Sequence, residues 1–148
     1  MKKFYFLIII LTLFSVSFSS CKKDDGDSKS SAIPQELVGK WHQVREKQVF
    51  YVDGKQESVY EQTDFSATGY IQYNSDGTAS FNENGKVQMT YKISIKNGMI
   101  ISTDNAGKPI DADAKYTVTA TTLNLHQDVT LPNKKETGTI DFDFVKVD

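Results

Sequence analysis

Cysteine and histidine are scarce in this chain of 148 residues. Cys21 is the sole cysteine, and the two histidines, His42 and His126, stand far apart in the sequence. These residues cannot form an internal disulfide or supply the Cys/His ligand set of a zinc site. We therefore expect a fold stabilised by packing, with no metal site and no cofactor.

Glycine and proline are also few, at 9 and 3 residues, whereas 39% of the residues are hydrophobic and 11% are aromatic. That composition is typical of a chain that buries a core. Of the 17 Lys and Arg residues, Lys2 and Lys3 lie in the leader described below, which leaves 15 against 19 Asp and Glu, a formal charge of -4 from Cys21 onward. A basic surface for nucleic acid is therefore not expected.

The motifs of the common enzyme classes are absent. The chain has no Gly-x-Ser-x-Gly elbow, no P-loop, no HExxH and no CxxC. Carboxylate pairs such as Glu57 and Glu61 share one face of a predicted strand, where acidic side chains ordinarily meet solvent. We therefore expect no catalytic residues and predict that the protein is not an enzyme.

Residues 1–20 have the pattern of an export signal. Lys2 and Lys3 precede an apolar run of 11 residues, from Phe4 to Phe14, with Thr12 as its one polar member. A helix needs roughly 20 apolar residues to span a bilayer, so this run fits a secretory signal and not a permanent anchor.

The residues around Cys21 resemble the lipobox of bacterial lipoproteins. Ser19 and Ser20 precede the cysteine, and Phe18 stands where that family usually has Leu. In such proteins the cysteine thiolate takes a diacylglycerol group, and a peptidase then cuts before it. The resemblance implies a lipidated Cys21 bearing acyl chains such as palmitate. Each buried methylene contributes about 0.8 kcal/mol, so two or three chains hold a protein to a membrane effectively permanently. The alternative is a free cysteine beside a signal cut elsewhere.

Residues 21–32 predict a flexible tether, because the stretch KKDDGDSKSS from Lys22 to Ser31 offers nothing to bury. The acidic cluster from Asp24 to Asp27 also resembles the export signals of surface-exposed lipoproteins in some Gram-negative bacteria, although any solvated linker has this composition. We expect a protein of the cell envelope, lipid-anchored to the outer membrane. Both a periplasmic and an outer-surface orientation stay open.

Residues 33–148 form the predicted domain, in which period-2 alternation recurs and helical spacing does not. From Val87 to Lys96 every odd position is apolar, which places Val87 on the core face together with Met89 and Tyr91. Asn97-Gly98 follows directly and favours a tight hairpin. The predicted strands cover residues 40–52, 57–62, 70–74, 79–82, 87–96, 99–103, 116–120, 122–127 and 139–147.

Eight or nine short antiparallel strands must hide their edges, and closure into a barrel removes edges altogether. The sequence therefore predicts an all-β fold, a small antiparallel up-and-down barrel of about eight strands. A β-sandwich is the alternative. We expect a monomer.

The start of this domain resembles the lipocalin-like family of small bacterial secreted domains. Leu37, Gly39 and Trp41 form an LxGxW pattern, and residues 70–78, 91–93 and 123–125 are similar to later segments of such domains. In lipocalins the tryptophan closes one end of the barrel beneath a basic side chain of the last strand. The resemblance thus implies structural roles at the barrel end for Gly39, Trp41 and Lys146.

Two functions stay open, because an eight-stranded barrel is either packed solid or just wide enough for one small ligand. In the first, the anchored barrel binds a small apolar molecule that enters opposite Trp41. The inward side chains of two alternating strands would bind it, with Tyr91 as their only hydrogen-bonding group: Met89, Tyr91, Ile93, Phe142 and Phe144. In the second, the barrel is filled, and its loops bind a protein or glycan as a surface interaction module.

Overall fold

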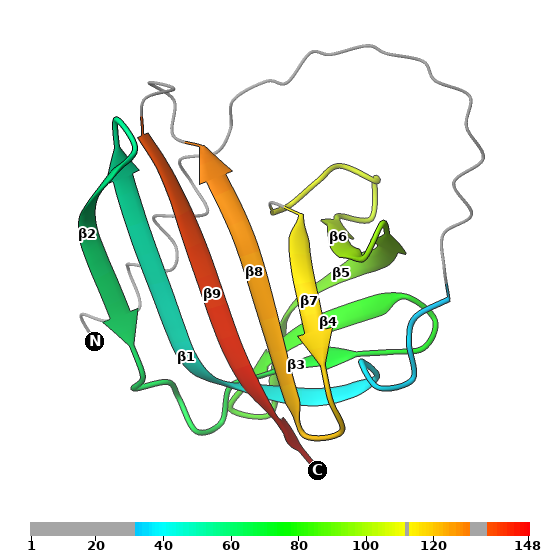
Figure 1. Cartoon of the computed structure of the whole chain (residues 1–148). Helices are drawn as coiled ribbons and strands as arrows, with labels where there is room; N and C mark the ends of the chain where they lie inside the picture. Colours follow the sequence, from blue (N-terminus) through cyan, green and yellow to red (C-terminus); the bar gives the residue numbers. More distant parts are fainter. Residues whose placement is uncertain (1–31, 112, 131–135) are drawn as a thin grey trace, which may run out of the picture.

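The computed structural model describes residues 32–111, 113–130 and 136–148. The predicted export signal, the lipidation site Cys21 and all but the last residue of the predicted tether lie outside these ranges. The described residues contain nine strands (Figure 1): β1 (Gly39–Val52), β2 (Lys55–Gln62), β3 (Tyr70–Tyr73), β4 (Thr78–Glu83), β5 (Lys86–Lys96), β6 (Met99–Thr103), β7 (Ala114–Val118), β8 (Thr122–Thr130) and β9 (Glu136–Val147).

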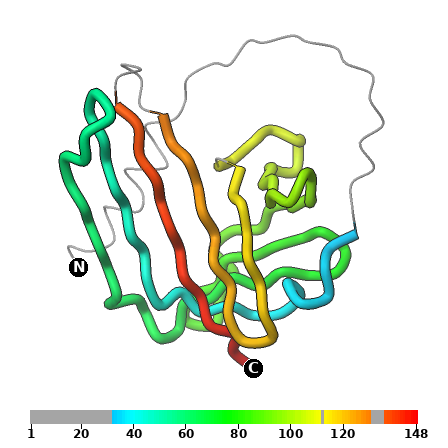
Figure 2. Tube along the Cα trace, viewed as in Figure 1, coloured from blue at the N-terminus to red at the C-terminus, as the bar shows by residue number. Residues whose placement is uncertain are grey.

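Eight of these strands form a closed antiparallel ring. From β3 to β9 each strand pairs with the next, β3 pairs with the start of β1, and β9 pairs with nearly the whole of β1. The second half of β1 also pairs with β2, which extends the wall beside the ring (Figures 1 and 2). The ring confirms the predicted all-β barrel, and the pairing of β1 with β9 excludes the β-sandwich alternative.

Three two-residue turns, among them the predicted Asn97-Gly98, connect successive strands with a positive φ at both positions. Only a residue that tolerates this backbone region can stand there, and Asn-Gly or Asp-Gly suits hairpins whose turns must follow the twist of the strands. These turns fix the registers of three hairpins and are Asp53-Gly54 (49° and 76°), Asn84-Gly85 (51° and 72°) and Asn97-Gly98 (53° and 74°).

A bulge in β1 decides which side chains of this strand face the barrel interior. The pairing of β1 with β9 shifts by one residue at Val44. One extra residue exchanges the faces of all residues beyond it. Strict alternation from the inward Trp41 would place Glu46 and Gln48 on the outer face, whereas the bulge turns both side chains inward.

A second bulge corrects the predicted face of Val87. Phe81 of β4 pairs with Met89, and the next residue, Asn82, pairs with Val87, so that Gln88 is the extra residue. Val87 therefore lies on the face opposite to that of Met89 and is 61% exposed. The prediction that Val87 shares the inward face was wrong, because the bulge interrupts the alternation.

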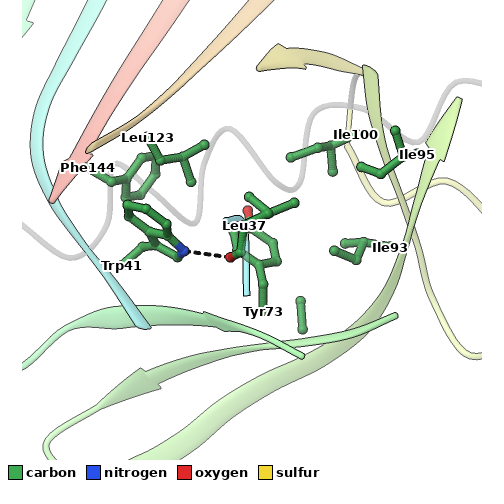
Figure 3. Close-up of a cluster of buried hydrophobic side chains, with 9 residues drawn as sticks. Leu37, Trp41, Tyr73, Ile93, Ile95, Ile100, Leu123 and Phe144 are labelled. Carbon is green, nitrogen blue, oxygen red and sulfur yellow. Dashed lines mark hydrogen bonds between the residues drawn. The ribbon is translucent and has the colours of Figure 1, made fainter. Parts of the chain in front are cut away.

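The buried core gathers where β1 begins and β9 ends. The segment before β1 folds across this end of the barrel: the backbone N–H of Leu37 donates to the carbonyl of Pro34 at 3.0 Å, and Leu37 is fully buried. In Figure 3, Leu37 and Tyr73 lie between the side chains of β1, β8 and β9 and the isoleucines of β5 and β6. The cluster consists of Leu37, Trp41, Tyr73, Ala79, Ile93, Ile95, Ile100, Leu123 and Phe144.

Candidate functional site

The structure brings together the three residues that the lipocalin resemblance placed at the barrel end. Trp41 is fully buried, and its Nε1 donates a hydrogen bond to the carbonyl of Leu37 at 2.8 Å (Figure 3). Lys146 Nζ lies 5.1 Å from the centroid of the Trp41 ring, within cation–π range. Gly39 leaves room for this lysine, since a Cβ on Gly39 would lie 2.7 Å from Lys146 Cε. We call this end of the barrel the closed end.

The opposite end is the mouth. Trp41 pairs with Lys146 near the end of β9, and antiparallel strands alternate in direction. The start of β9, the β1–β2 turn and the β4–β5 turn therefore belong to the mouth end of the barrel. Met89, early in β5, lies toward this end.

The five predicted ligand residues divide between the two halves of the barrel. Ile93 and Phe144 are 6% and 4% exposed and belong to the core cluster of the closed end. Tyr91 and Phe142 are only partly buried and pack against that cluster. Met89 is 41% exposed. Ile93 and Phe144 therefore fill the barrel, and Tyr91, Phe142 and Met89 remain accessible.

The lining of the mouth half is partly polar. Direct partners on antiparallel strands share a face, so the registers of β1, β9 and β8 define rows of neighbours across the inner wall. The row nearer the closed end contains Glu46, Phe142 and Leu125. The next row toward the mouth contains Gln48, Ile140 and Gln127. The three polar residues, Glu46, Gln48 and Gln127, are 8%, 8% and 6% exposed.

The carboxylate of Glu46 accepts hydrogen bonds from two neutral amides. Gln48 Nε2 donates to Oε1 at 2.5 Å, and Gln43 Nε2 donates to Oε2 at 3.4 Å. Among the described residues, no lysine, arginine or histidine forms an ion pair with Glu46. The inner wall thus carries a buried carboxylate without a cationic partner.

Tyr91 holds the only hydrogen-bonding group among the five predicted ligand residues, but other polar side chains also face the barrel interior. Glu46, Gln48 and Gln127 are inward as well, and the hydroxyl of Tyr91 is hydrogen-bonded to that of Tyr73. Burial raises the pKa of Tyr91 to about 12, and the bond to Tyr73 opposes this effect in part. Tyr91 is therefore a neutral phenol that already has a partner.

The inward position of Gln127 could have been found from the sequence, because it continues the alternation of Leu123 and Leu125. Glu46 and Gln48 gave no such signal. Their faces depend on the bulge at Val44, which arises from pairing with a strand about a hundred residues away.

A shallow depression of about 250 Å³ lies on the outer wall of the barrel. Thr117, Asn124 and Asp143 are direct partners across β7, β8 and β9 on the outer face. Of the predicted ligand residues only Phe144 borders the depression, which is distinct from the barrel interior. Its lining consists of Val44, Thr117, Thr122, Leu123, Asn124, Asp143, Phe144 and Val145.

Three charged side chains and one amide connect four strands on this outer face. Arg45 lies between Glu61 and Asp143, at 2.8 Å from each carboxylate. Burial raises the pKa of Asp143, but hydrogen bonds from Arg45 and Asn124 outweigh that effect and hold it below its ordinary value. The group links β2, β1, β9 and β8 and belongs to the wall, not to the interior.

His126, also on the outer face, predicts a pH-dependent stability. Its Nδ1 lies 2.7 Å from Asp141 Oδ1, and this hydrogen bond raises the pKa of His126. A raised pKa in the folded state stabilises the protein below the ordinary histidine pKa, and this stabilisation is lost as the pH rises through the raised value. Between about pH 6 and about pH 8.5, the free energy of unfolding should fall more in the wild type than in His126→Gln.

Urea denaturation at both pH values measures this difference. The two proteins differ at residue 126 alone, so every other side chain contributes equally to both. An identical pH dependence in the two proteins would contradict a stabilising His126–Asp141 pair.

No group of three or more His, Cys, Asp or Glu side chains within residues 32–111, 113–130 and 136–148 could hold a metal ion. In the same part of the chain, no helix combines the length and the apolar character needed to cross a membrane.

Comparison with known proteins gave a weak likeness to a solved structure. No protein-family model and no curated protein matches the sequence. The structure is similar to a solved structure described as "Bovine Odorant Binding Protein deswapped triple mutant", with 16% sequence identity, a TM-score of 0.40, and coverage of 76% of this chain and 75% of that one. Because this likeness is weak, the barrel assignment here depends on the strand pairing itself.

Proposed function

We propose that this is a lipid-anchored protein of the cell envelope whose barrel binds one small molecule with an apolar body. The supporting observation is the contrast between the two halves of the interior. The closed half is filled by the core cluster, whereas Tyr91, Phe142 and Leu125 face inward and remain only partly buried. Since these side chains point into the barrel, the surface that they retain is available to a ligand that enters from the mouth.

The anchor supports the same function. The lipobox-like residues before Cys21 support attachment to the outer membrane through a lipid on that cysteine. A binding protein held in this way would capture a ligand close to the membrane. It acts as a monomer, it takes no nucleic acid partner, and it catalyses no reaction.

Titration with fluorescent retinol and fatty-acid analogues tests ligand binding. The test uses the chain from residue 21 onward with Cys21 replaced by Ser, which contains every described residue and needs no detergent. Phe142→Ala should weaken binding by at least about tenfold, because burying an aromatic side chain contributes about 1.5–3 kcal/mol. Tyr91→Phe keeps the apolar body and should change the affinity little.

Val87→Ala is the matched control, since this exposed residue lies on the face of β5 opposite to Met89 and should leave the affinity unchanged. If neither these analogues nor the simple alkyl ligands hexylamine, 1-hexanol and hexanoate bound to the folded protein, the proposal would fail. The alternative function, a filled barrel that binds a protein or glycan through its loops, would then be favoured.

A further inference from the structure

We infer that the ligand of the barrel carries a cationic group that pairs with the carboxylate of Glu46. This inference rests on the proposed function and specifies the chemistry of its ligand. Three observations support it: the burial of Glu46, its hydrogen bonds, and its neighbours on the inner wall.

The first observation is a buried carboxylate without an opposite charge. Glu46 is 8% exposed, and its direct partner on β9 is the inward Phe142. Burial of an ionised carboxylate is costly unless a positive charge or several hydrogen bonds compensate it. Among the described residues the compensation comes from neutral amides alone, so a cationic ligand would supply the missing charge.

The second observation concerns the acceptor sites that remain. A carboxylate can accept roughly four hydrogen bonds, and that of Glu46 receives two, one on each oxygen. Gln43 and Gln48 hold the carboxylate in place as donors. An ammonium group, which has only donors, can therefore bind without displacing either amide.

The third observation is the apolar surface beside this carboxylate. In the row of Glu46 across the inner wall stand Phe142, Leu125 and, on β7, Tyr116. All three pack against the core cluster and are only partly buried. Two of them are aromatic and attract a cation with their ring faces. An alkyl or aryl chain with a terminal ammonium group fits both parts of this row.

Isothermal titration calorimetry with three ligands of equal chain length tests the inference. Hexylamine, 1-hexanol and hexanoate share one apolar body and differ in the charge of the head group. We expect hexylamine to bind about tenfold more tightly than 1-hexanol, since an ammonium group adds the attraction of opposite charges to its hydrogen bond with the carboxylate and a neutral hydroxyl does not. Hexanoate should bind more weakly than 1-hexanol, because its charge repels Glu46.

Glu46→Gln keeps the shape of the side chain and removes its charge. It should weaken hexylamine binding about tenfold and leave 1-hexanol binding within about twofold. Glu61→Gln is the matched control, because this exposed carboxylate pairs with Arg45 on the outer face and should change neither affinity. If Glu46→Gln did not fold, the relative affinities of the three ligands for the unmutated barrel would still test the preference for a cation.

The outcomes separate the inference from the proposed function. If the unmutated barrel bound 1-hexanol or hexanoate as tightly as hexylamine or more tightly, the inference of a cationic ligand would be overturned. The proposed function, a barrel that binds a small molecule, would stand. An amine preference that survives Glu46→Gln would also overturn it. If none of the three ligands bound, the inference would be overturned, and the proposed function would be overturned with it only if the retinol and fatty-acid analogues failed as well.

Discussion

Replacing Trp41 with alanine should lower the free energy of unfolding by about 3–5 kcal/mol, the range for removal of a large buried aromatic side chain. The loss has three sources in the structure. The indole is fully buried in the core cluster, it donates a hydrogen bond to Leu37, and it lies beneath Lys146. The variant would leave both a cavity and an unpaired carbonyl at the closed end.

Urea denaturation followed by far-UV circular dichroism measures this change, because Trp41 is the sole tryptophan and its fluorescence disappears with it. Val87→Ala is the control, since a side chain that is 61% exposed should cost little. A loss below about 1 kcal/mol for Trp41→Ala would contradict its role. So would a wild-type emission spectrum typical of a solvent-exposed indole.

Replacing Cys21 with alanine should abolish acylation and release the protein from the outer-membrane fraction. Without the thiol no diacylglycerol can be attached, and the apolar run from Phe4 to Phe14 is too short to anchor the protein as a spanning helix. Metabolic labelling with a palmitate analogue and fractionation of cells measure both effects.

Ser28→Thr is a suitable control for Cys21→Ala, because it alters the stretch after the lipobox-like residues and retains both those residues and the thiol. The Cys21→Ala protein should lose its label and its outer-membrane location, and the control should keep both. Recovery of an unlabelled Cys21→Ala protein in the outer membrane would refute the proposed anchor.

The features of the fold that could be predicted from the sequence are those with local causes. Asn97-Gly98 stands at a positive-φ turn because few other pairs tolerate that backbone, and the turn fixes its own hairpin. The alternation of Ile93 and Ile95 placed both side chains in the core, where the structure has them. Local signals of this kind define most strand boundaries within a few residues.

The faces that could not be predicted depend on bulges, which have no local signature. Gln88 and Val44 are extra residues only with respect to partner strands, β4 in one case and the distant β9 in the other. If β1 alternated without the bulge at Val44, the side chain of Glu46 would lie on the outer face as an ordinary exposed acid. The candidate site was for this reason predicted as apolar, whereas its mouth half also contains buried polar side chains.

The seam between β1 and β9 has a consequence for how the protein is made. The paired residues of β1 and β9 are separated by about a hundred residues of chain. Bringing the two strands together therefore has a large entropic cost, which arises before their pairing can stabilise the fold. During synthesis β1 emerges early and keeps one edge unpaired until β9 appears. Folding should therefore occur after translation of β9 and be slow for a domain of this size. Until then the unpaired edge of β1 is exposed, which gives a chaperone time to bind.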